Sequence, residues 1–215
     1  MATLWFVEEI LTFAQENAGE IRRRVDEAAS ESVVGQTLAT RATFAQSDEE
    51  VTILLGEVAE ERHPQTGEII LRRLDTVTPT RMHEYGTFEA SETEVAPDVY
   101  SVLPEAADAL ERLMAHGVAV VPAPEGEQLR VERFLIESST TAARPFQGRV
   151  ERTITGSWEA TAEVLPPGTM AVPVDQPLGR LAFSLLEPRS DDGFTNWAIL
   201  DDAIEAGNYP ILRSR

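Results

Sequence analysis

The segment from residue 165 to residue 193 limits what this chain can fold into more than any other, because proline and glycine recur in it at short intervals. Pro166-Pro167-Gly168 predicts a tight turn, and the apolar run at residues 178–186 predicts a short buried helix. Glu187-Pro188 predicts the end of that helix, because a residue before proline is driven out of the helical conformation. Asp191-Asp192-Gly193 predicts another turn. Rigid turns around a short apolar helix favour a packed scaffold over a mobile active-site loop.

The rest of the chain predicts an α+β fold whose C-terminal part is rich in β-strands. Alternating apolar and polar residues between prolines and glycines are typical of strands. Alternation marks residues 51–58 and 68–74, and further strands are predicted at residues 37–45, 118–121, 129–138, 149–154, 157–165, 170–174 and 209–212. Thr155-Gly156 predicts a turn between two of these strands, and Pro104 and Gly117 flank a second helix at residues 104–116. We expect the C-terminal strands to form a sandwich-like or mixed sheet.

Residues 3–29 predict one long N-terminal helix with an apolar face. Apolar residues recur there at alternating spacings of three and four, namely Leu4, Val7, Leu11, Ala14, Ala18, Ile21, Val25 and Ala28. Gly19 is the weak point, since glycine inside a helix costs about 1 kcal/mol relative to alanine. The apolar face packs either on its own chain or on another domain or subunit. The expected domains are an amphipathic helix, residues 1–30, and a β-rich domain, residues 31–215, with a sub-boundary near residues 125–130.

Charge narrows the class of partner. The chain of 215 residues has 37 acidic and 18 basic residues, a net charge of −19, and every basic residue is arginine. Such a surface repels nucleic acid and anionic membranes, because both are bound through clustered cations. The acidic, lysine-free composition has two interpretations. It reflects either a GC-rich genome or halophilic adaptation, in which salt screens the self-repulsion of the carboxylates.

The sequence carries few signs of its compartment. Its first residues lack the basic and apolar regions of a signal peptide, and no run approaches the roughly 20 apolar residues that span a bilayer. Cysteine is absent, which excludes disulfides and thiolate metal sites. We expect a soluble protein whose compartment the sequence leaves open.

Several ordered blocks carry a family resemblance. They are Arg144-Pro-Phe-Gln-Gly148, Leu165-Pro-Pro-Gly168, Asp175-Gln-Pro-Leu-Gly-Arg-Leu-Ala182, and Leu185-Leu-Glu-Pro188 with Ser190-Asp-Asp-Gly193. Together they resemble the C-terminal region of large bacterial zinc carboxypeptidases, which are metallopeptidases of the carboxypeptidase A type. The N-terminal helix is similar to the segment that closes the catalytic domain of those proteins. The resemblance implies an α+β accessory region that lies beside a peptidase domain.

The residues that perform the chemistry of that family have no counterpart here. The family holds zinc with a His-x-x-Glu pair and a distant histidine, binds the substrate carboxylate with an arginine, and uses a glutamate as general base. This chain has three histidines, His63, His83 and His116, and none is followed by glutamate three positions later. We expect no catalytic residue, metal ligand or cofactor in this chain, with zinc confined to an upstream catalytic domain. Family members also often have histidine where this chain has Arg149.

Five residues of the family-like blocks and Trp197, which follows the last block, form a candidate structural or binding cluster: Gln147, Gln176, Arg180, Asp191, Asp192 and Trp197. Arg180 and Asp192 suit a buried ion pair that would fix the local conformation. The two glutamines are better suited to satisfying backbone groups than to binding a ligand. The two aspartates precede a glycine and favour a turn over a Ca²⁺ site, because the ordered spacing of calcium-binding carboxylates is missing.

Three functions remain open at this stage. The leading hypothesis is a non-catalytic accessory region that packs against or supports a peptidase domain or other subunit through the N-terminal helix. The alternative is a stand-alone peptide- or glycan-binding module, which an aromatic-lined groove near Trp158 or Trp197 would favour, although these residues and Trp5 are better interpreted as core or interface anchors. The third is a metallopeptidase or other hydrolase whose non-standard site assembles from His63, His83 and scattered carboxylates.

Overall fold

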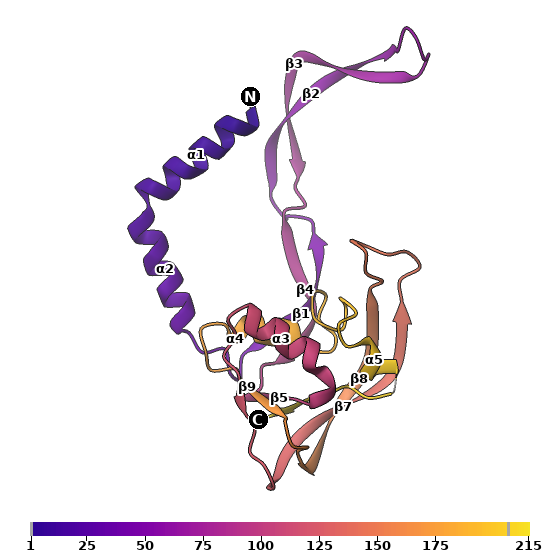
Figure 1. Cartoon of the computed structure of the whole chain (residues 1–215). Coiled ribbons are helices and arrows are strands. Elements are labelled where there is room, and N and C mark those ends of the chain that lie inside the picture. Colours follow the sequence, from indigo (N-terminus) through magenta and orange to yellow (C-terminus); the bar gives the residue numbers. More distant parts are fainter. Residues whose placement is uncertain (1, 206) are drawn as a thin grey trace. The chain divides into compact units, whose positions relative to one another are not determined.

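The computed structural model describes residues 2–205 and 207–215 (Figure 1). The helices are α1 (Ala2–Glu16), α2 (Ala18–Ser30), the 3-10 turn η1 (Pro104–Ala106), α3 (Ala107–Ala115), α4 (Gly179–Leu186) and α5 (Asp201–Glu205). The strands are β1 (Thr37–Ala45), β2 (Glu50–Arg62), β3 (Ile69–His83), β4 (Thr87–Val95), β5 (Val99–Val102), β6 (Val121–Pro122), β7 (Gln128–Thr141), β8 (Arg152–Val164), β9 (Met170–Pro173) and β10 (Ile211–Ser214). The chain is therefore α+β and rich in strands, which confirms the coarse fold class.

Six strands of the C-terminal part form one antiparallel sheet in the order β6-β9-β5-β10-β7-β8. The last strand, β10, lies inside the sheet, because Leu212 is opposite Ser101 of β5 and Arg133 of β7. The end of the chain therefore joins two halves of the sheet. The expectation of a sandwich-like or mixed sheet is wrong, since these strands make a single sheet with antiparallel pairing.

Helices α3 and α4 cover one face of this sheet (Figure 1). Leu113 of α3 and Phe183 of α4 pack with Phe134, Val172 and Ile211 of the strands, and none of the five is more than 2% exposed. Neighbouring strand residues point to the other face, where a smaller apolar cluster includes Leu212. Apolar side chains are thus buried on both faces. We call residues 92–215 the sheet body.

Strand β8 replaces two predicted strands and the turn between them. Residues 149–154 and 157–165 were expected to be separate, but one strand pairs with β7 along its whole length, with a register shift between Ile136 and Ser138. A Cβ atom added to Gly156 would lie 2.0 Å from the carbonyl oxygen of Leu135. The turn expected at Thr155-Gly156 is therefore wrong. Glycine is needed there for a close approach of two backbones at a bulge.

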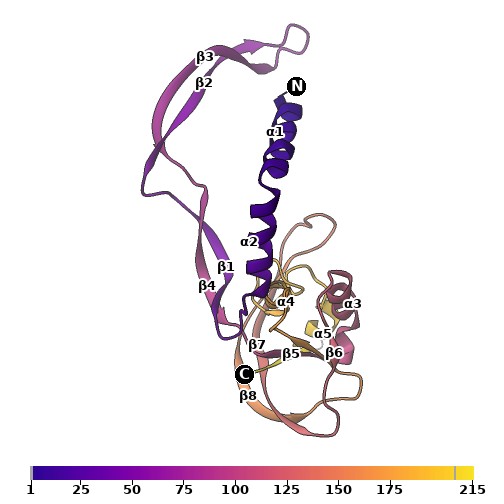
Figure 2. The same cartoon turned by 90° about the vertical axis from the view of Figure 1, so that its left-hand side faces the viewer.

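Residues 42–91, here called the ribbon, form a unit separate from the rest of the chain. Within it β2 pairs with β3 from Glu50 and His83 to Arg62 and Ile69, which makes a long two-stranded hairpin (Figure 2). No residue from 42 to 91 is buried. The hairpin was predicted, but both strands are longer than expected. This division of the chain differs from the predicted boundaries at residue 30 and near residues 125–130.

The N-terminal apolar segment is two helices rather than one. Asn17 separates α1 from α2 and has φ −108° and ψ 13°. Its side-chain amide donates a hydrogen bond of 2.8 Å to the carbonyl of Phe13, which competes with the regular helix pattern. The predicted single helix over residues 3–29 is therefore wrong in its continuity, and the break falls two residues before Gly19. No helix in the described part of the chain has the length and apolar character needed to span a membrane.

Candidate functional site

Three of the six predicted cluster residues meet in one groove of the sheet body. Gln147, Asp192 and Trp197 line a space of about 490 Å³ together with Arg112, His116 and Arg149. Leu181, Leu185, Phe194 and Ile199 supply its apolar lining. We call this feature the cationic groove, because three basic side chains face one carboxylate in it. Sequence reasoning placed Gln147, Asp192 and Trp197 in a candidate cluster but missed Arg112 and Arg149 as residues of the groove.

A strained turn places Gln147 at the groove. Phe146 and Arg149 exchange backbone hydrogen bonds of 2.8 and 2.9 Å, and the two residues between them have positive φ, 49° at Gln147 and 80° at Gly148. Positive φ at both central residues defines a type I′ turn, which favours asparagine or aspartate followed by glycine. Glutamine gains little from this conformation, and its side chain makes no hydrogen bond to another described residue. The prediction that Gln147 satisfies backbone groups is therefore wrong.

The loop after α4 holds the aromatic side of the groove. The indole N–H of Trp197 donates a hydrogen bond to the Asp192 carboxylate, and the Trp197 amide bonds to the carbonyl of Gly193 at 3.0 Å. Phe194 is anchored by an amide hydrogen bond of 2.9 Å to Leu185 of α4. The next residue after Trp197, Ala198, has φ 56°. The loop is thus fixed to α4 and presents Trp197 toward the turn, where its ring lies 6.4 Å from that of Phe146.

The basic residues of the groove come from a helix end and from the turn. Arg112 belongs to the last turn of α3, and His116 is its C-terminal capping residue. Arg149 closes the type I′ turn. Within residues 2–205 and 207–215, neither Arg112 nor Arg149 makes an ion pair, and Asp192 is engaged by Trp197. The groove therefore carries an excess of positive charge on a chain whose net charge is −19.

The other three predicted residues lie elsewhere. Gln176 accepts a hydrogen bond from the Ala119 amide at 2.7 Å and donates to the Ala119 and Pro173 carbonyls, which confirms its predicted backbone role. Arg180 lines a different cavity with residues of α2, so the predicted pair of Arg180 with Asp192 is not formed. Asp191 lies 3.8 Å from Arg41, and its amide bonds to Thr40.

A buried ion pair that the sequence did not reveal lies under the helices. Glu187, which follows α4, is 1% exposed, and it lies 3.3 Å from the guanidinium of Arg213 on β10. The Tyr100 hydroxyl donates to the same carboxylate at 2.6 Å, and the Trp158 indole donates at 3.4 Å. The guanidinium also contacts Glu132 at 2.5 Å and stacks over the Trp158 ring. The ion pairs of Arg213 and the hydrogen bonds from Tyr100 and Trp158 thus join strands β5, β7, β8 and β10 to the end of α4.

Burial controls the ionisation of this centre. Burial raises the pKa of Glu187, although the hydrogen bond from Tyr100 and the charge of Arg213 act in the opposite direction. Burial also raises the pKa of Tyr100 well above its usual range, and the neighbouring Glu187 carboxylate adds to this. The Tyr100 hydroxyl and the Glu187 carboxyl group, both with raised pKa values, thus satisfy each other's hydrogen bonding in the core. We interpret this centre as structural, because Tyr100, Glu187 and Arg213 are each at most 2% exposed and bind one another.

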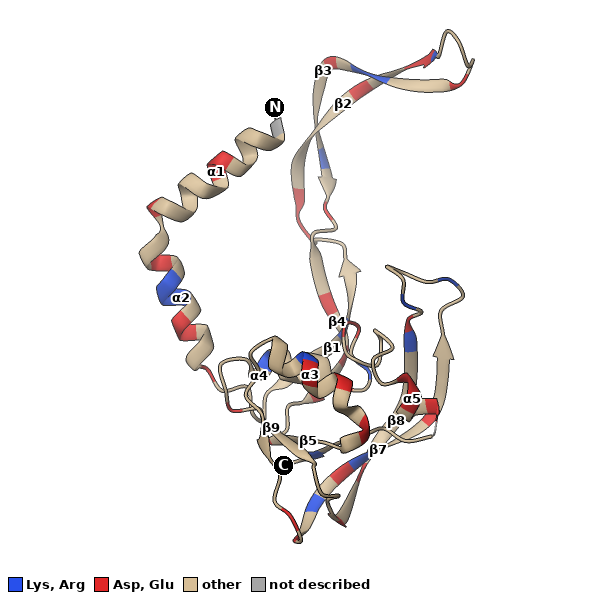
Figure 3. Ribbon diagram, viewed as in Figure 1, with Lys and Arg blue, Asp and Glu red and all other residues tan. Residues whose placement is uncertain are grey.

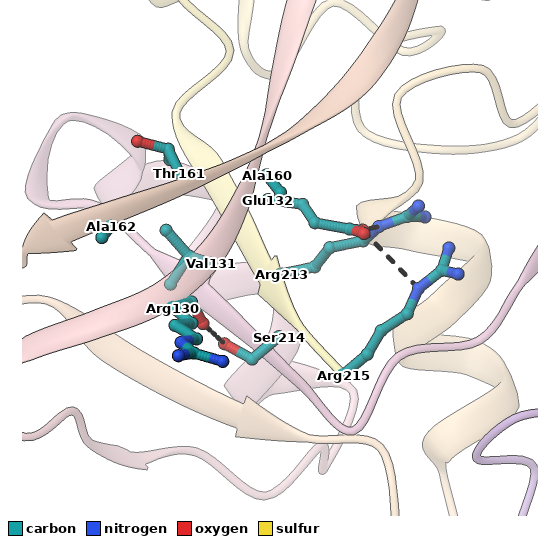
Figure 4. A pocket seen from close by; sticks show the side chains of 9 residues that line it. All are labelled: Arg130, Val131, Glu132, Ala160, Thr161, Ala162, Arg213, Ser214 and Arg215. Carbon is teal, nitrogen blue, oxygen red and sulfur yellow. Dashed lines mark hydrogen bonds and ion pairs between the residues drawn. The ribbon is translucent and has the colours of Figure 1, made fainter.

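Figure 4 shows a second, smaller pocket on the sheet body. Glu132 links Arg213 to Arg215, and the Ser214 hydroxyl lies 3.4 Å from the carbonyl of Arg130. Its volume is about 360 Å³, and strands β7, β8 and β10 form its walls. Most of its charge is already neutralised, since Arg213 and Arg215 both contact Glu94 and Glu132. This pocket offers a ligand fewer free groups than the cationic groove.

The three histidines occupy separate places. The Nδ1 atom of His63 accepts hydrogen bonds from the amides of Gln65 and Thr66 in the ribbon loop, and that of His83 lies 2.8 Å from the Ser47 carbonyl. His63 and His83 belong to the ribbon, whereas His116 lies at the end of α3. Across the described ranges, no three His, Cys, Asp or Glu side chains are grouped so that they could hold a metal.

Two apolar surfaces stand out in addition to the grooves. The helix surface consists of Trp5, Phe6, Leu11 and Phe13 of α1, which are 60% to 66% exposed. The ribbon surface consists of Leu54, Val58, Ile69, Leu71 and Val77, and Leu54 and Leu71 are 68% and 65% exposed. Figure 3 shows that charged residues are sparse along α1. Both surfaces expose several large apolar side chains, and exposed apolar patches mark surfaces that bind another protein.

Comparison of the chain with protein-family models, with curated proteins and with solved structures gives no match in any of the three.

Proposed function

We propose that this chain is a non-catalytic docking module of a zinc carboxypeptidase-like system, and that its helix and ribbon surfaces pack against a peptidase domain. The observation that carries the proposal is the ribbon, in which fifty residues contain no buried side chain. An isolated two-stranded hairpin is marginally stable at best in water. A ribbon of this length, with its apolar side chains exposed, would be stabilised by a protein surface that covers them.

The helix surface supports the same proposal. From residue 3 to residue 30 no side chain is buried, although α1 carries a tryptophan and two phenylalanines. Burying a large apolar side chain contributes roughly 1.5–3 kcal/mol relative to leaving it in water. Several such side chains on each surface are enough to offset the cost of association, which is on the order of 4–15 kcal/mol.

Charge favours a different protein over a second copy as the occupant. Two copies would each bring a net charge of −19, and their repulsion opposes association at low ionic strength. A partner whose apolar patch is bordered by basic residues gains from the same charge, for example from Glu8, Glu9 and Glu16 of α1, a helix without a basic residue. The resemblance to bacterial zinc carboxypeptidases supports a peptidase domain as the partner, because the N-terminal helix is similar to the segment that closes their catalytic domain.

The proposal is tested with the zinc carboxypeptidase domain encoded in the same genome, produced separately and mixed with this chain. Sedimentation velocity measures the complex, and release of C-terminal amino acids from a peptide measures activity. Leu11→Asp on α1 and Leu71→Asp on the ribbon are each expected to weaken the complex at least about tenfold, because each buries a charge at an apolar contact. Val164→Asp is the matched control, since Val164 is 58% exposed but lies on β8, outside both surfaces.

Three outcomes would overturn the proposal. The first is that no complex forms, and the second is that Val164→Asp weakens it as strongly as Leu71→Asp. The third is that the purified chain alone binds zinc and releases C-terminal amino acids, which would contradict its non-catalytic role. A dimer of this chain that Leu71→Asp dissociates would replace the peptidase domain by a second copy as the occupant.

The cationic groove favours a second candidate function, that of a peptide- or glycan-binding module. Phe194 and Trp197 provide aromatic surface beside polar groups in a concave site, an arrangement common in ligand pockets. This function does not exclude docking, because the groove belongs to the sheet body and the docking surfaces lie on α1 and the ribbon.

A further inference from the structure

We propose that the cationic groove binds an amphipathic organic carboxylate, that is, a small molecule or chain end with one carboxylate and an aromatic or branched aliphatic group. This inference does not depend on the docking proposal, because every residue that lines the groove lies between positions 112 and 199. It rests on the charge of the groove, its apolar lining and its backbone conformation.

The charge of the groove is opposite to that of the chain. Acidic residues outnumber arginines by 37 to 18, so most arginines have carboxylates available to them. Arg213, for example, contacts three carboxylates. Arg112 and Arg149 nevertheless make no ion pair with any described residue, although both line the same groove. Guanidinium groups bind carboxylates through two parallel hydrogen bonds, so this pair suits an anionic ligand.

The apolar lining determines the rest of the ligand. Leu181 and Leu185 of α4 and Phe194 and Ile199 of the following loop line the groove beside the arginines. Its volume of about 490 Å³ lies in the range of small-molecule sites. A ligand that places its carboxylate at the guanidinium groups can therefore bury a phenyl or branched alkyl group against these side chains. A small inorganic anion would leave the apolar lining in contact with water.

Asp192 favours a singly charged head group. Its carboxylate lines the groove and is held by the Trp197 indole. Like charges in a partly enclosed site repel each other, so a doubly charged phosphate is disfavoured more than a carboxylate. The indole N–H is already used by Asp192, which leaves the ring face of Trp197 for an apolar contact.

Backbone strain is concentrated at the groove. In the described part of the chain, the non-glycine residues with positive φ are Gln147 and Ala198, at 49° and 56°. Gln147 lines the groove, and Ala198 lies between two residues that line it, Trp197 and Ile199. Such conformations cost of order 1–3 kcal/mol each and occur most often at functional sites. Here they hold the two loops that present Arg149 and Trp197 to the same space.

The probe is 3-phenylpropionate, added to the full chain in low-salt buffer because salt screens exposed charges. Binding is followed by amide and indole chemical shifts in heteronuclear NMR spectra. The indole signal of Trp197 and the amides near Gln147 are expected to shift with saturation. The neutral analogue 3-phenylpropanol and phenyl phosphate are each expected to bind at least about tenfold more weakly, and acetate, which lacks the apolar group, likewise.

Variants locate the site and separate it from the pocket in Figure 4. Arg112→Gln combined with Arg149→Gln is expected to weaken binding at least about tenfold, with thermal unfolding as the check of folding. Arg130→Gln is the matched control, because Arg130 also makes no ion pair but lines the other pocket. Equal affinity for the carboxylate and the alcohol would overturn the proposal, as would loss of binding only in Arg130→Gln. So would the absence of saturable shifts up to about 10 mM ligand.

Discussion

The sheet body and the ribbon are built from similar strand sequences but differ in what covers them. In the sheet body Phe134, Val172 and Ile211 are almost wholly buried under α3 and α4. In the ribbon Leu54 and Leu71 are more than half exposed, and no side chain is buried. Apolar residues in a strand therefore indicate that another surface covers the strand, but they do not indicate whether that surface belongs to the same chain. The helices α3 and α4 cover the sheet body, and we propose that a partner covers the ribbon.

The first prediction concerns the buried ion pair that fixes the sheet body. Arg213→Met removes the guanidinium that contacts Glu187, Glu132 and Glu94. It leaves a carboxylate that is 1% exposed without its charged partner, which we expect to lower the free energy of unfolding by about 3–5 kcal/mol. Urea denaturation followed by circular dichroism measures this change.

Arg215→Met is the control for the same experiment. Arg215 contacts Glu94 and Glu132, but its side chain is 42% exposed, so we expect a loss of about 1 kcal/mol or less. Equal losses in the two variants would mean that burial does not distinguish these arginines, and the account of the centre would fail.

The second prediction separates a charged from a neutral hydrogen bond inside the sheet body. Tyr100→Phe deletes a hydroxyl that donates to the buried Glu187 carboxylate at 2.6 Å, with an expected loss of about 1.5–3 kcal/mol. Tyr209→Phe deletes one that donates to the Leu186 carbonyl at 2.7 Å, with an expected loss of about 1 kcal/mol. Both tyrosines are buried, so the comparison isolates the charge of the acceptor. Unfolding midpoints in urea test the order, and a larger loss in Tyr209→Phe would reverse it.

Sequence reasoning succeeded where local chemistry decides the structure. It placed a helix at residues 178–186 because Pro177 precedes the apolar run and Glu187-Pro188 ends it, and α4 spans Gly179–Leu186. It also placed β1 at residues 37–45 and α3 behind Pro104. It failed at Thr155-Gly156, where a glycine permits a close approach between strands and not a turn. A bulge depends on the partner strand, which the local sequence does not contain.

The candidate site was predicted in part for the same reason. Gln147, Asp192 and Trp197 do meet, because the loop around residue 147 and the loop after α4 line the same groove. The pair of Glu187 with Arg213 was missed, since the two residues are 26 positions apart and only sheet pairing brings them together. A lone arginine among the apolar residues of the last strand was the available signal. The relation to zinc carboxypeptidases stays a prediction.

The third prediction concerns the pH dependence of stability. Two carboxyl groups of the sheet body, Glu187 and Glu163, have pKa values shifted in opposite directions. Burial raises the pKa of Glu187 above its usual 4.5, so the folded protein keeps a proton that the unfolded chain loses, and stability falls as pH rises through that interval. The hydrogen bond from Arg133 lowers the pKa of Glu163, so its contribution is present above pH 4.5 and lost as pH falls through the folded pKa.

Urea midpoints measured from acid to neutral pH test both signs. The stability deficit of Glu187→Gln relative to the wild type is expected to shrink as pH rises above 4.5. The stability deficit of Glu163→Gln relative to the wild type is instead expected to grow as pH rises toward 4.5. Parallel curves for the two variants would contradict the assignment of opposite pKa shifts.

The smallest expected effect is in the ribbon. Leu71→Ser removes a side chain that is 65% exposed in the chain alone, so the free energy of unfolding should change by no more than about 0.5 kcal/mol. Phe183→Ala in the sheet body, where Phe183 is 1% exposed, is expected to cost about 3–5 kcal/mol. A large loss in Leu71→Ser, measured on a monomeric sample, would show that the ribbon is already covered by its own chain.

Hydrogen–deuterium exchange of the backbone amides tests the contrast between the two regions most directly. In the isolated monomer, amides of β5, β7 and β10 should exchange only through global unfolding, whereas those of β2 and β3 should exchange through local opening at a free energy near zero. Addition of the peptidase domain should protect β2, β3 and α1 while it leaves the sheet body unchanged. Protection of β2 and β3 in the monomer as strong as that of β10 would contradict the account, and so would a complex in which they stay unprotected.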